Sequence, residues 1–275
     1  MRTISFLTVC LLLPASLFAE DRGSKRKAAA KRFELRVEEE GWKGADHINL
    51  RAVCDSACSE ITVHFSGKEK LDLEPIRIRH DKSGPIVLFK RSLREELVVL
   101  LSSKGTYWSQ HAYQIAHEFC HILCRFKEGD KTNLWFEESL CELASIYSLR
   151  QMAITWKKSP PYSNWKSYAD SLRSYAEDVE KKHALPENQS FADWFRKNRE
   201  QLTEKATQRE LNGIVAVQLL PIFEANPEAW QTLPYLNVGR GKEQQSFNDY
   251  LRAWHDNTPE GLRAHVAKIT REFKL

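Results

Sequence analysis

The segment HEFCH, residues 117–121, constrains the fold of this chain more than any other feature. On a helix, His117 and His121 are four residues apart, so both imidazoles project from one face about one turn from each other. Two imidazoles placed in this way can reach one metal ion and leave positions open for a third ligand and a water. Glu118 lies on the same turn, where its carboxylate can accept a proton from that water. The segment predicts either a metal site or two ordinary helix histidines.

Hydrophobic periodicity predicts that this segment is helical and that a second long helix follows it. Apolar residues recur at helical spacing over residues 109–126 and again over 134–156, and KEGDKTN separates the two runs. Further helices are predicted over residues 162–179, 190–202, 208–224, 246–255 and 259–273. In two of them, Ser190 and Ser246 stand three residues before an acidic residue, which is the pattern of a helix cap.

The part of the chain before residue 107 is predicted to form strands. Residues 32–37, 60–65 and 76–80 alternate apolar and polar side chains, while residues 85–90 and 97–101 are short apolar runs suited to more buried strands. The short loops between them favour a mostly antiparallel sheet. Strands followed by helices predict an α+β fold.

A tetrahedral catalytic metal site needs a third protein ligand, and the second helix offers three glutamates. Glu138 and Glu142 are four residues apart and share a face, so one of them can bind metal while the other supports the site from behind. A carboxylate that is hydrogen-bonded to a ligand histidine fixes its tautomer and raises its basicity. Glu137 points about 100° away and is predicted to be a solvated surface acid.

The two predicted helices resemble the active-site helices of the gluzincin zinc metallopeptidases, the group that contains thermolysin and the membrane-alanyl-type aminopeptidases. The resemblance covers residues 117–142, where HEFCH and LWFEESLCE are similar to the two family motifs. It implies that His117, His121 and Glu138 bind zinc, that Glu118 is the general base, and that Glu142 is the supporting acid.

The chain departs from the family pattern at two positions of the second motif. Glu137 stands where the family usually has asparagine, and Ser139 stands where it usually has glycine. The subfamily and the cleavage preference therefore stay open. The family also implies a substrate strand along a sheet edge, for which residues 97–103 are the candidate. It further implies an oxyanion-stabilising side chain, for which the candidates are Tyr107, Tyr113, Tyr235 and His255.

Pattern and resemblance together predict a zinc-dependent metallopeptidase, a hydrolase that cleaves a peptide or protein substrate through a metal-activated water. Residues 33–156 are predicted to form the zincin-like catalytic core, with residues 157–275 as a helical C-terminal region. The alternative is a secreted, non-catalytic binding or scaffold protein on a zincin-like fold.

The N-terminus predicts export. Residues 1–19 have the positive start, apolar core and small final residue of a signal peptide, with cleavage after Ala19. The apolar core has about fifteen residues where about 20 are needed to span a bilayer, so no stable membrane insertion is predicted after cleavage. The predicted location is the periplasm or the extracellular space.

Charge argues against a nucleic-acid partner. Six basic and no acidic residues lie in residues 22–32, so residues 20–32 are predicted to be a basic, flexible segment. Seven of the 41 basic and two of the 37 acidic residues precede Phe33. The remainder of the chain therefore contains 34 basic and 35 acidic residues. A nearly neutral body lacks the basic surface that nucleic acids require.

Five cysteines remain after the predicted cleavage, in an oxidising compartment where disulfides persist. Cys54 and Cys58 are candidates for a disulfide that closes a small loop. Cys120, Cys124 and Cys141 flank the predicted site, either as a link between the two helices or as small buried side chains. A cysteine ligand for zinc is not predicted, because the two histidines and Glu138 already form a complete set.

Overall fold

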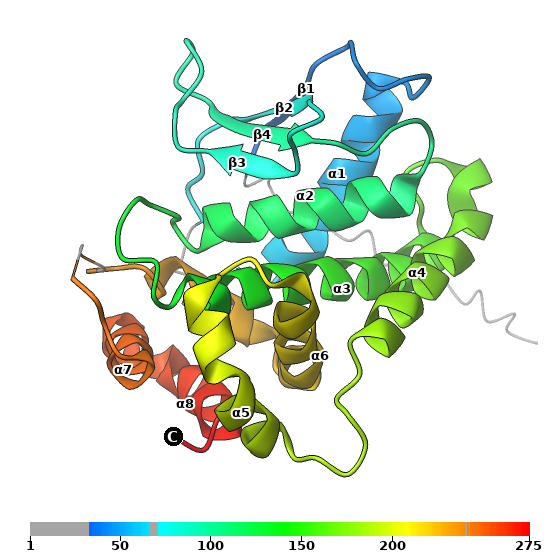
Figure 1. Ribbon diagram of the computed structural model, residues 1–275. Coiled ribbons are helices and arrows are strands. Elements are labelled where there is room, and N and C mark those ends of the chain that lie inside the picture. The colour runs from blue at the N-terminus through cyan, green and yellow to red at the C-terminus, as the bar shows by residue number, and fades with distance from the viewer. Residues whose placement is uncertain (1–32, 66–70, 240, 242) are drawn as a thin grey trace, which may run out of the picture. The chain divides into compact units, whose positions relative to one another are not determined.

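A small mixed sheet and two long helices beneath it organise the protein. The computed structural model describes residues 33–65, 71–239, 241 and 243–275, all of which belong to one compact unit, Lys31–Leu275 (Figure 1). The predicted signal peptide, residues 1–19, and basic segment, residues 20–32, lie outside the described residues.

The sheet has four strands in the order β1-β2-β4-β3. Strand β2 (Ile76–His80) pairs in parallel with both β1 (Leu35–Val37) and β4 (Leu97–Leu101), whereas β3 (Ile86–Leu88) pairs antiparallel with β4. The predicted α+β class is confirmed, but the prediction of a mostly antiparallel sheet is wrong. Because β3 is the edge strand and β4 lies inside the sheet, the prediction of residues 97–103 as the edge is also wrong.

Helix α1 (His47–Thr62) explains why β1 and β2 are parallel. Residues 60–65 were predicted to form a strand, yet α1 runs through the first part of this segment and ends at Thr62. Its buried side chains recur at helical spacing (Leu50, Val53, Cys54, Ala57, Cys58 and Ile61), and the Asp46 carboxylate caps it by accepting from the amides of Ile48 and Asn49. A helix between β1 and β2 carries the chain back across the sheet, which allows the two strands to run parallel.

All seven predicted helices are present. They are α2 (Trp108–Leu123), α3 (Leu134–Lys158), α4 (Ala169–Lys182), α5 (Phe191–Glu204), α6 (Arg209–Ala225), α7 (Phe247–Asn257) and α8 (Arg263–Glu272), together with the 3-10 helices η1 (Ser163–Tyr168), η2 (Pro227–Tyr235) and η3 (Glu260–Leu262). The hydroxyls of Ser190 and Ser246 accept from the amides of Asp193 and Asp249, as the cap pattern predicted. None of the described helices has the length and apolar character needed to cross a bilayer.

Helices α2 and α3 lie side by side beneath the sheet and link it to the C-terminal helices (Figure 1). An aromatic cluster anchors the start of α3 to α5, α7 and the residue that follows α8: the ring centroids of Trp135 and Phe247 are 4.7 Å apart, and those of Phe195 and Phe273 are 4.9 Å apart. Each fully buried aromatic side chain of this kind contributes about 1.5–3 kcal/mol. The cluster holds rigidly the helix that carries the predicted third ligand.

A buried carboxylate ties the sheet together on the side away from this cluster. Glu96 is fully buried and accepts hydrogen bonds from the guanidinium groups of Arg36 and Arg77, each at 2.6 Å, and from the Ser92 hydroxyl at 2.8 Å. Burial alone would raise the pKa of Glu96, but the bonds from Arg77, Ser92 and Arg36 outweigh it and lower the pKa to about 2. The negative charge is therefore more stable in the folded protein than in the unfolded chain.

We expect the substitution Glu96→Gln to lower the free energy of unfolding at pH 7 by about 1–3 kcal/mol, because it weakens a buried, charge-assisted network. Ionised Glu96 stabilises the fold fully above the pKa of an unfolded glutamate, about 4.3, and this contribution is lost as the pH falls toward about 2. Urea unfolding at pH 7, 4 and 2.5 should show that the difference in free energy of unfolding between the wild type and Glu96→Gln becomes smaller as the pH falls. The exposed Glu40→Gln variant is the control, and a gap that widens with falling pH would contradict the assignment.

Candidate metal centre

The side chains of His117 and His121 lie together on α2 and face Glu138 on α3. The Nε2 atom of His117 is 3.4 Å from one Glu138 carboxylate oxygen, and the Nε2 atom of His121 is 3.6 Å from the other. Four ligands arranged tetrahedrally at about 2.0–2.1 Å from zinc are separated by about 3.3 Å. These separations are therefore close to those that a tetrahedral ion requires, and both imidazoles present the same ring nitrogen.

The other ring nitrogen of His121 is held by Glu137. Nδ1 of His121 and Oε1 of Glu137 are 2.7 Å apart, and the Asn237 side-chain amide donates to Oε2 of Glu137 at 2.8 Å. The Tyr250 hydroxyl in turn donates to Oδ1 of Asn237. The prediction that Glu137 is a solvated surface acid is wrong: only 1% of this residue is exposed, because α3 is covered by other elements on nearly every side around the site.

A second carboxylate supports His117. Oε1 of Glu142 lies 3.9 Å from Nδ1 of His117, and the Tyr113 hydroxyl donates a hydrogen bond to Oε2 of the same carboxylate. Each imidazole thus has Glu138 on its Nε2 side and another carboxylate on its Nδ1 side. The hydrogen bond with Glu137 orients the His121 ring and makes it a better ligand, whereas Glu142 acts on His117 through its charge.

The surroundings of the two imidazoles favour positive charge. Burial acts to lower the pKa of His117 and of His121, but nearby carboxylates raise both: Glu138, Glu142 and Glu118 around His117, and Glu137 first around His121. For the carboxyl group of Glu138, burial acts to raise the pKa. Its hydrogen bond to His117 and the positive charges around it outweigh burial and lower the pKa. The same field favours a divalent cation between these groups.

Glu118 lies on the turn between the two histidines and is 3% exposed. Burial raises the pKa of Glu118, while the imidazoles and a hydrogen bond with the Val87 backbone act in the opposite direction. A carboxylate whose pKa is raised toward neutrality suits both proton uptake and proton release.

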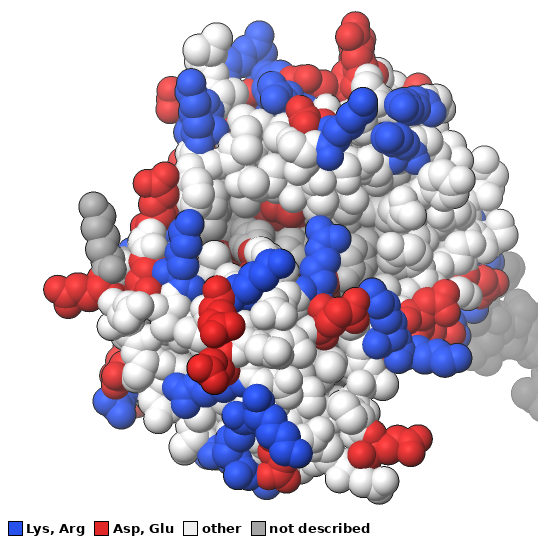
Figure 2. Space-filling view, viewed as in Figure 1, with Lys and Arg blue, Asp and Glu red and all other residues white. Residues whose placement is uncertain are grey.

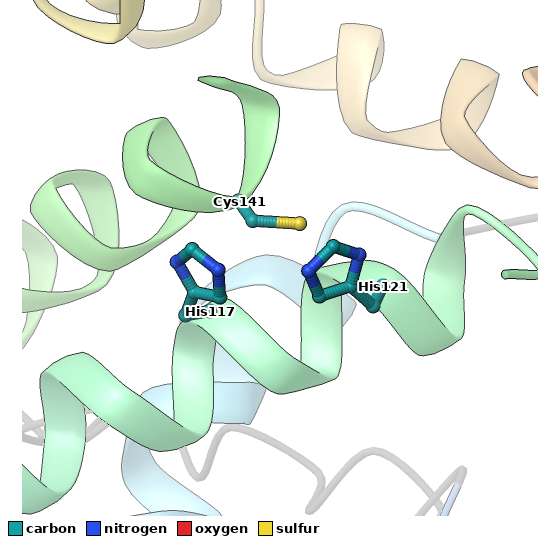
Figure 3. A group of neighbouring side chains, drawn as sticks. All are labelled: His117, His121 and Cys141. Atoms are coloured by element: carbon teal, nitrogen blue, oxygen red, sulfur yellow. The ribbon is translucent and has the colours of Figure 1, made fainter. Parts of the chain in front are cut away.

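Cys141 forms a second grouping with the same two histidines. One ligand atom from each of His117, His121 and Cys141 lies within 4.8 Å of the others, and this group could hold a metal ion (Figure 3). The thiol is fully buried, and burial raises the pKa of Cys141 well above its ordinary value. Because a thiol binds metal as the thiolate, Glu138 is the better-prepared third ligand.

Among the described residues no disulfide joins the five cysteines, and all five are buried. Cys54 and Cys58 do not form the predicted disulfide. Both lie on α1, one turn apart, where the backbone hydrogen bonds of the helix already hold the chain and leave no loop to close. Cys120, Cys124 and Cys141 pack between α2 and α3, as small buried side chains rather than as a covalent link.

An open cavity of about 1080 Å³ leads to these residues. Its lining includes His117, His121, Glu118, Glu138 and Glu142, with edge strand β3 on one side and the ends of α4 and α6 on another. Figure 2 shows the hollow, with acidic side chains at its base and lysine or arginine side chains around its mouth. A molecule that enters the cavity can therefore reach His117, His121 and Glu118.

Of the four candidates for an oxyanion-stabilising residue, Tyr113 is the one that lines the cavity. Its hydroxyl is engaged with Glu142, while Tyr107 is largely exposed at the start of α2 and His255 lies beside Asp256 on α7. Tyr175 also lines the cavity and packs edge-on against the Tyr113 ring, with centroids 5.8 Å apart. Its spacing on α4 predicted only an apolar stripe.

Sequence reasoning did not find Glu137, Asn237 or the α6 residues of the cavity. For Glu137 a signal existed, because residues 134–149 contain no basic residue and, apart from three glutamates, consist of apolar, aromatic or small side chains, which is typical of a helix buried all round. Asn237 is 100 residues away from Glu137, and no local pattern connects the two.

Comparisons of this chain with protein-family models, with curated proteins and with solved structures find no match.

We expect Glu138→Gln to weaken zinc affinity by more than about 100-fold, whereas Cys141→Ser leaves it within about threefold. Loss of a direct ligand should weaken metal affinity more than loss of a supporting carboxylate, which typically weakens it by about 10- to 100-fold. Competition with a coloured zinc chelator measures both values. The reverse order of effects would make Cys141 the third ligand.

We expect Glu137→Gln to weaken zinc affinity by about 10- to 100-fold, because it removes the charge that holds His121 in its ligand tautomer. The same chelator competition measures this effect, and circular dichroism checks that the fold is kept. An unchanged affinity would show that Glu137 serves packing alone.

Proposed function

We propose that this protein is an exported zinc metallopeptidase of the gluzincin type. The observation that carries the proposal is that the Nε2 atoms of His117 and His121 converge on Glu138 at 3.4 and 3.6 Å, beside Glu118 and at the base of an open cavity. Two imidazoles and a carboxylate with an accessible fourth position are the donor set of a catalytic zinc site.

The residues present suit zinc better than a hard cation. Magnesium and calcium prefer cages of oxygen ligands, whereas imidazole nitrogen favours zinc and its neighbours in the transition series. His117, His121 and Glu138 would hold the ion, with Glu137 orienting the imidazole of His121 and the negative charge of Glu142 beside His117. When bound, zinc supplies a Lewis acid that polarises a carbonyl and acidifies water.

Glu118 is the acid–base group of the proposed reaction. Its carboxylate takes the proton of the water that attacks the scissile carbonyl, and later delivers this proton to the leaving amine. A non-catalytic metal site has no use for a buried carboxylate between its two histidine ligands, so the position of Glu118 favours hydrolysis over a structural role.

Edge strand β3 is the place where the peptide would bind. Pro85, Ile86, Val87 and Phe89 line the cavity along this strand, and β3 pairs with β4 on one side only. An extended peptide can add to such an edge through main-chain hydrogen bonds. The sheet edge, rather than the interior strand β4, would position the scissile bond.

The alternative function is a non-catalytic binding or scaffold protein with a structural metal. The observation that favours it is the grouping of Cys141 with the two histidines. A site closed by a buried thiolate would be suited to holding the fold together, and chelation would then lower the melting temperature strongly without any loss of a hydrolytic activity.

We expect the Glu118→Gln variant to hydrolyse an unfolded protein substrate about 10²- to 10⁴-fold more slowly than the wild type, because it lacks the proton-transfer group. Its zinc content, measured by elemental analysis, should be unchanged. Glu128→Gln is the matched control, since Glu128 lines the same cavity outside the two ligand helices. Equal rates in wild type and Glu118→Gln would contradict the peptidase proposal. The proposal would also fail if the wild type showed no hydrolysis that a chelator suppresses.

A further inference from the structure

The cavity has a second group of polar residues, at the ends of α4 and α6, which takes no part in the proposed metal site. Arg209 is the first residue of α6, is exposed and lines the cavity. Within the described part of the chain, its guanidinium group has no ion pair or hydrogen bond. Lys182, which also lines the cavity, differs because it is paired with Glu210 at 2.9 Å.

The N-terminus of α6 faces the same space. Thr207, Arg209 and Asn212 all line the cavity, and Gln208, at the N-cap position, makes no side-chain capping hydrogen bond. The first turn of a helix presents amide N–H groups and a partial positive charge, which together favour an anion. The charge of Arg209 adds to this field at the same helix end.

Two nearly buried side chains in this wall have polar atoms without partners. The Asn212 side chain donates to the carbonyl oxygens of Trp135 and Ala206, each at 2.9 Å, so its orientation is determined, and its Oδ1 accepts no hydrogen bond. His183 is 6% exposed, and neither ring nitrogen has a hydrogen-bond partner, although its Nε2 atom lies 3.7 Å from the Glu210 carboxylate. Unsatisfied buried groups typically cost about 1–3 kcal/mol each, which points to a polar ligand at this wall.

His183 is held in place by the close approach of α6. The ring packs against the backbone of Gly213, where a Cβ atom would lie 2.4 Å from its Cγ. A glycine inside a helix costs about 1 kcal/mol relative to alanine, so this close contact has a measurable cost. The contact brings His183 and Asn212 into one wall beside Arg209.

We propose that this wall is an anion subsite, in which Arg209 and the first turn of α6 bind a carboxylate of the peptide substrate. The inference rests on the proposed function for the identity of the ligand as a substrate. A guanidinium group binds a carboxylate through two parallel hydrogen bonds, and the free Oδ1 of Asn212 can accept from a neighbouring peptide N–H. The positive charge of Arg209 also acts on Glu138 and Tyr113, so a peptide bound here lies near the proposed catalytic residues.

The charges of the cavity favour a carboxylate on this side. Glu118, Glu138 and Glu142 lie together at the metal-binding end, where their negative charges disfavour a further carboxylate, whereas the charge of Arg209 has no ion pair within the described residues. The shared chemistry is a carboxylate, and it has two sources: an aspartate or glutamate side chain, or the C-terminus of the peptide.

Binding to the zinc-loaded Glu118→Gln protein tests the subsite without requiring hydrolysis. Four fluorescent peptide libraries are compared by anisotropy; their variable positions carry either Glu or Gln, and their C-termini are either free or amidated. We expect the best carboxylate library to bind at least about tenfold more tightly than the amidated Gln library, or about 1.4 kcal/mol. In the Glu118→Gln, Arg209→Ala double variant, this ratio should fall below about twofold.

Lys131→Ala is the matched control, because Lys131 contributes one cavity-lining positive charge from the loop before α3. It should keep the preference, which separates a subsite at Arg209 from a general attraction to the cavity. Equal binding of all four libraries, or a preference that survives Arg209→Ala, would overturn the proposal, as would equal losses in the Arg209 and Lys131 variants. Loss of preference on amidation identifies the C-terminus as the source, and loss on the Glu-to-Gln change identifies a side chain.

The two proposals fail separately. Arg209-dependent binding in a protein whose wild type hydrolyses nothing would contradict the peptidase proposal and keep the subsite. Hydrolysis by the wild type, with no carboxylate preference in the binding assay, would support the peptidase proposal and contradict the subsite.

Discussion

The packing of α2 against α3 is the interaction on which the site depends. It brings His117 and His121 from one helix to within 3.4 and 3.6 Å of a single carboxylate on the other. It also places Glu137 and Glu142 behind the two imidazoles. Carboxylates this close repel one another when all are ionised, so positive charge between them, from a protonated imidazole or a bound cation, stabilises the cluster.

The fold keeps this cluster in place through apolar packing at both ends. The sheet and α1 cover one side of α2, and the aromatic cluster around Trp135 and Phe247 fixes the start of α3. Polar contacts then set the finer geometry, since the chain from Tyr250 through Asn237 to Glu137 determines which nitrogen of His121 faces Glu138. The cavity separates charge, with acids at its base and Arg209 at the N-terminus of α6.

Sequence reasoning succeeded where the information is local. Helix periodicity placed α2 and α3, and serine caps placed the starts of α5 and α7, because these features depend on residues a few positions apart. It failed at α1, where three alternating apolar residues at the end of the segment were weighed above the helical spacing that precedes them. That error hid the connection that lets β1 and β2 run parallel. The parallel pairing of β2 with β4 was missed separately, because β4 lies between β2 and β3 in the sheet.

The HEFCH and LWFEESLCE segments by themselves determined which nitrogens and carboxylates can meet, since helix geometry decides which side chains share a face. The tertiary structure decided what surrounds them: that Glu137 is buried against His121, that β3 is the edge beside the cavity, and that Arg209 lines it. These relations join residues that are distant in the chain or belong to different elements. Burial and long-range contact depend on how whole elements pack, and no short stretch of sequence carries that information.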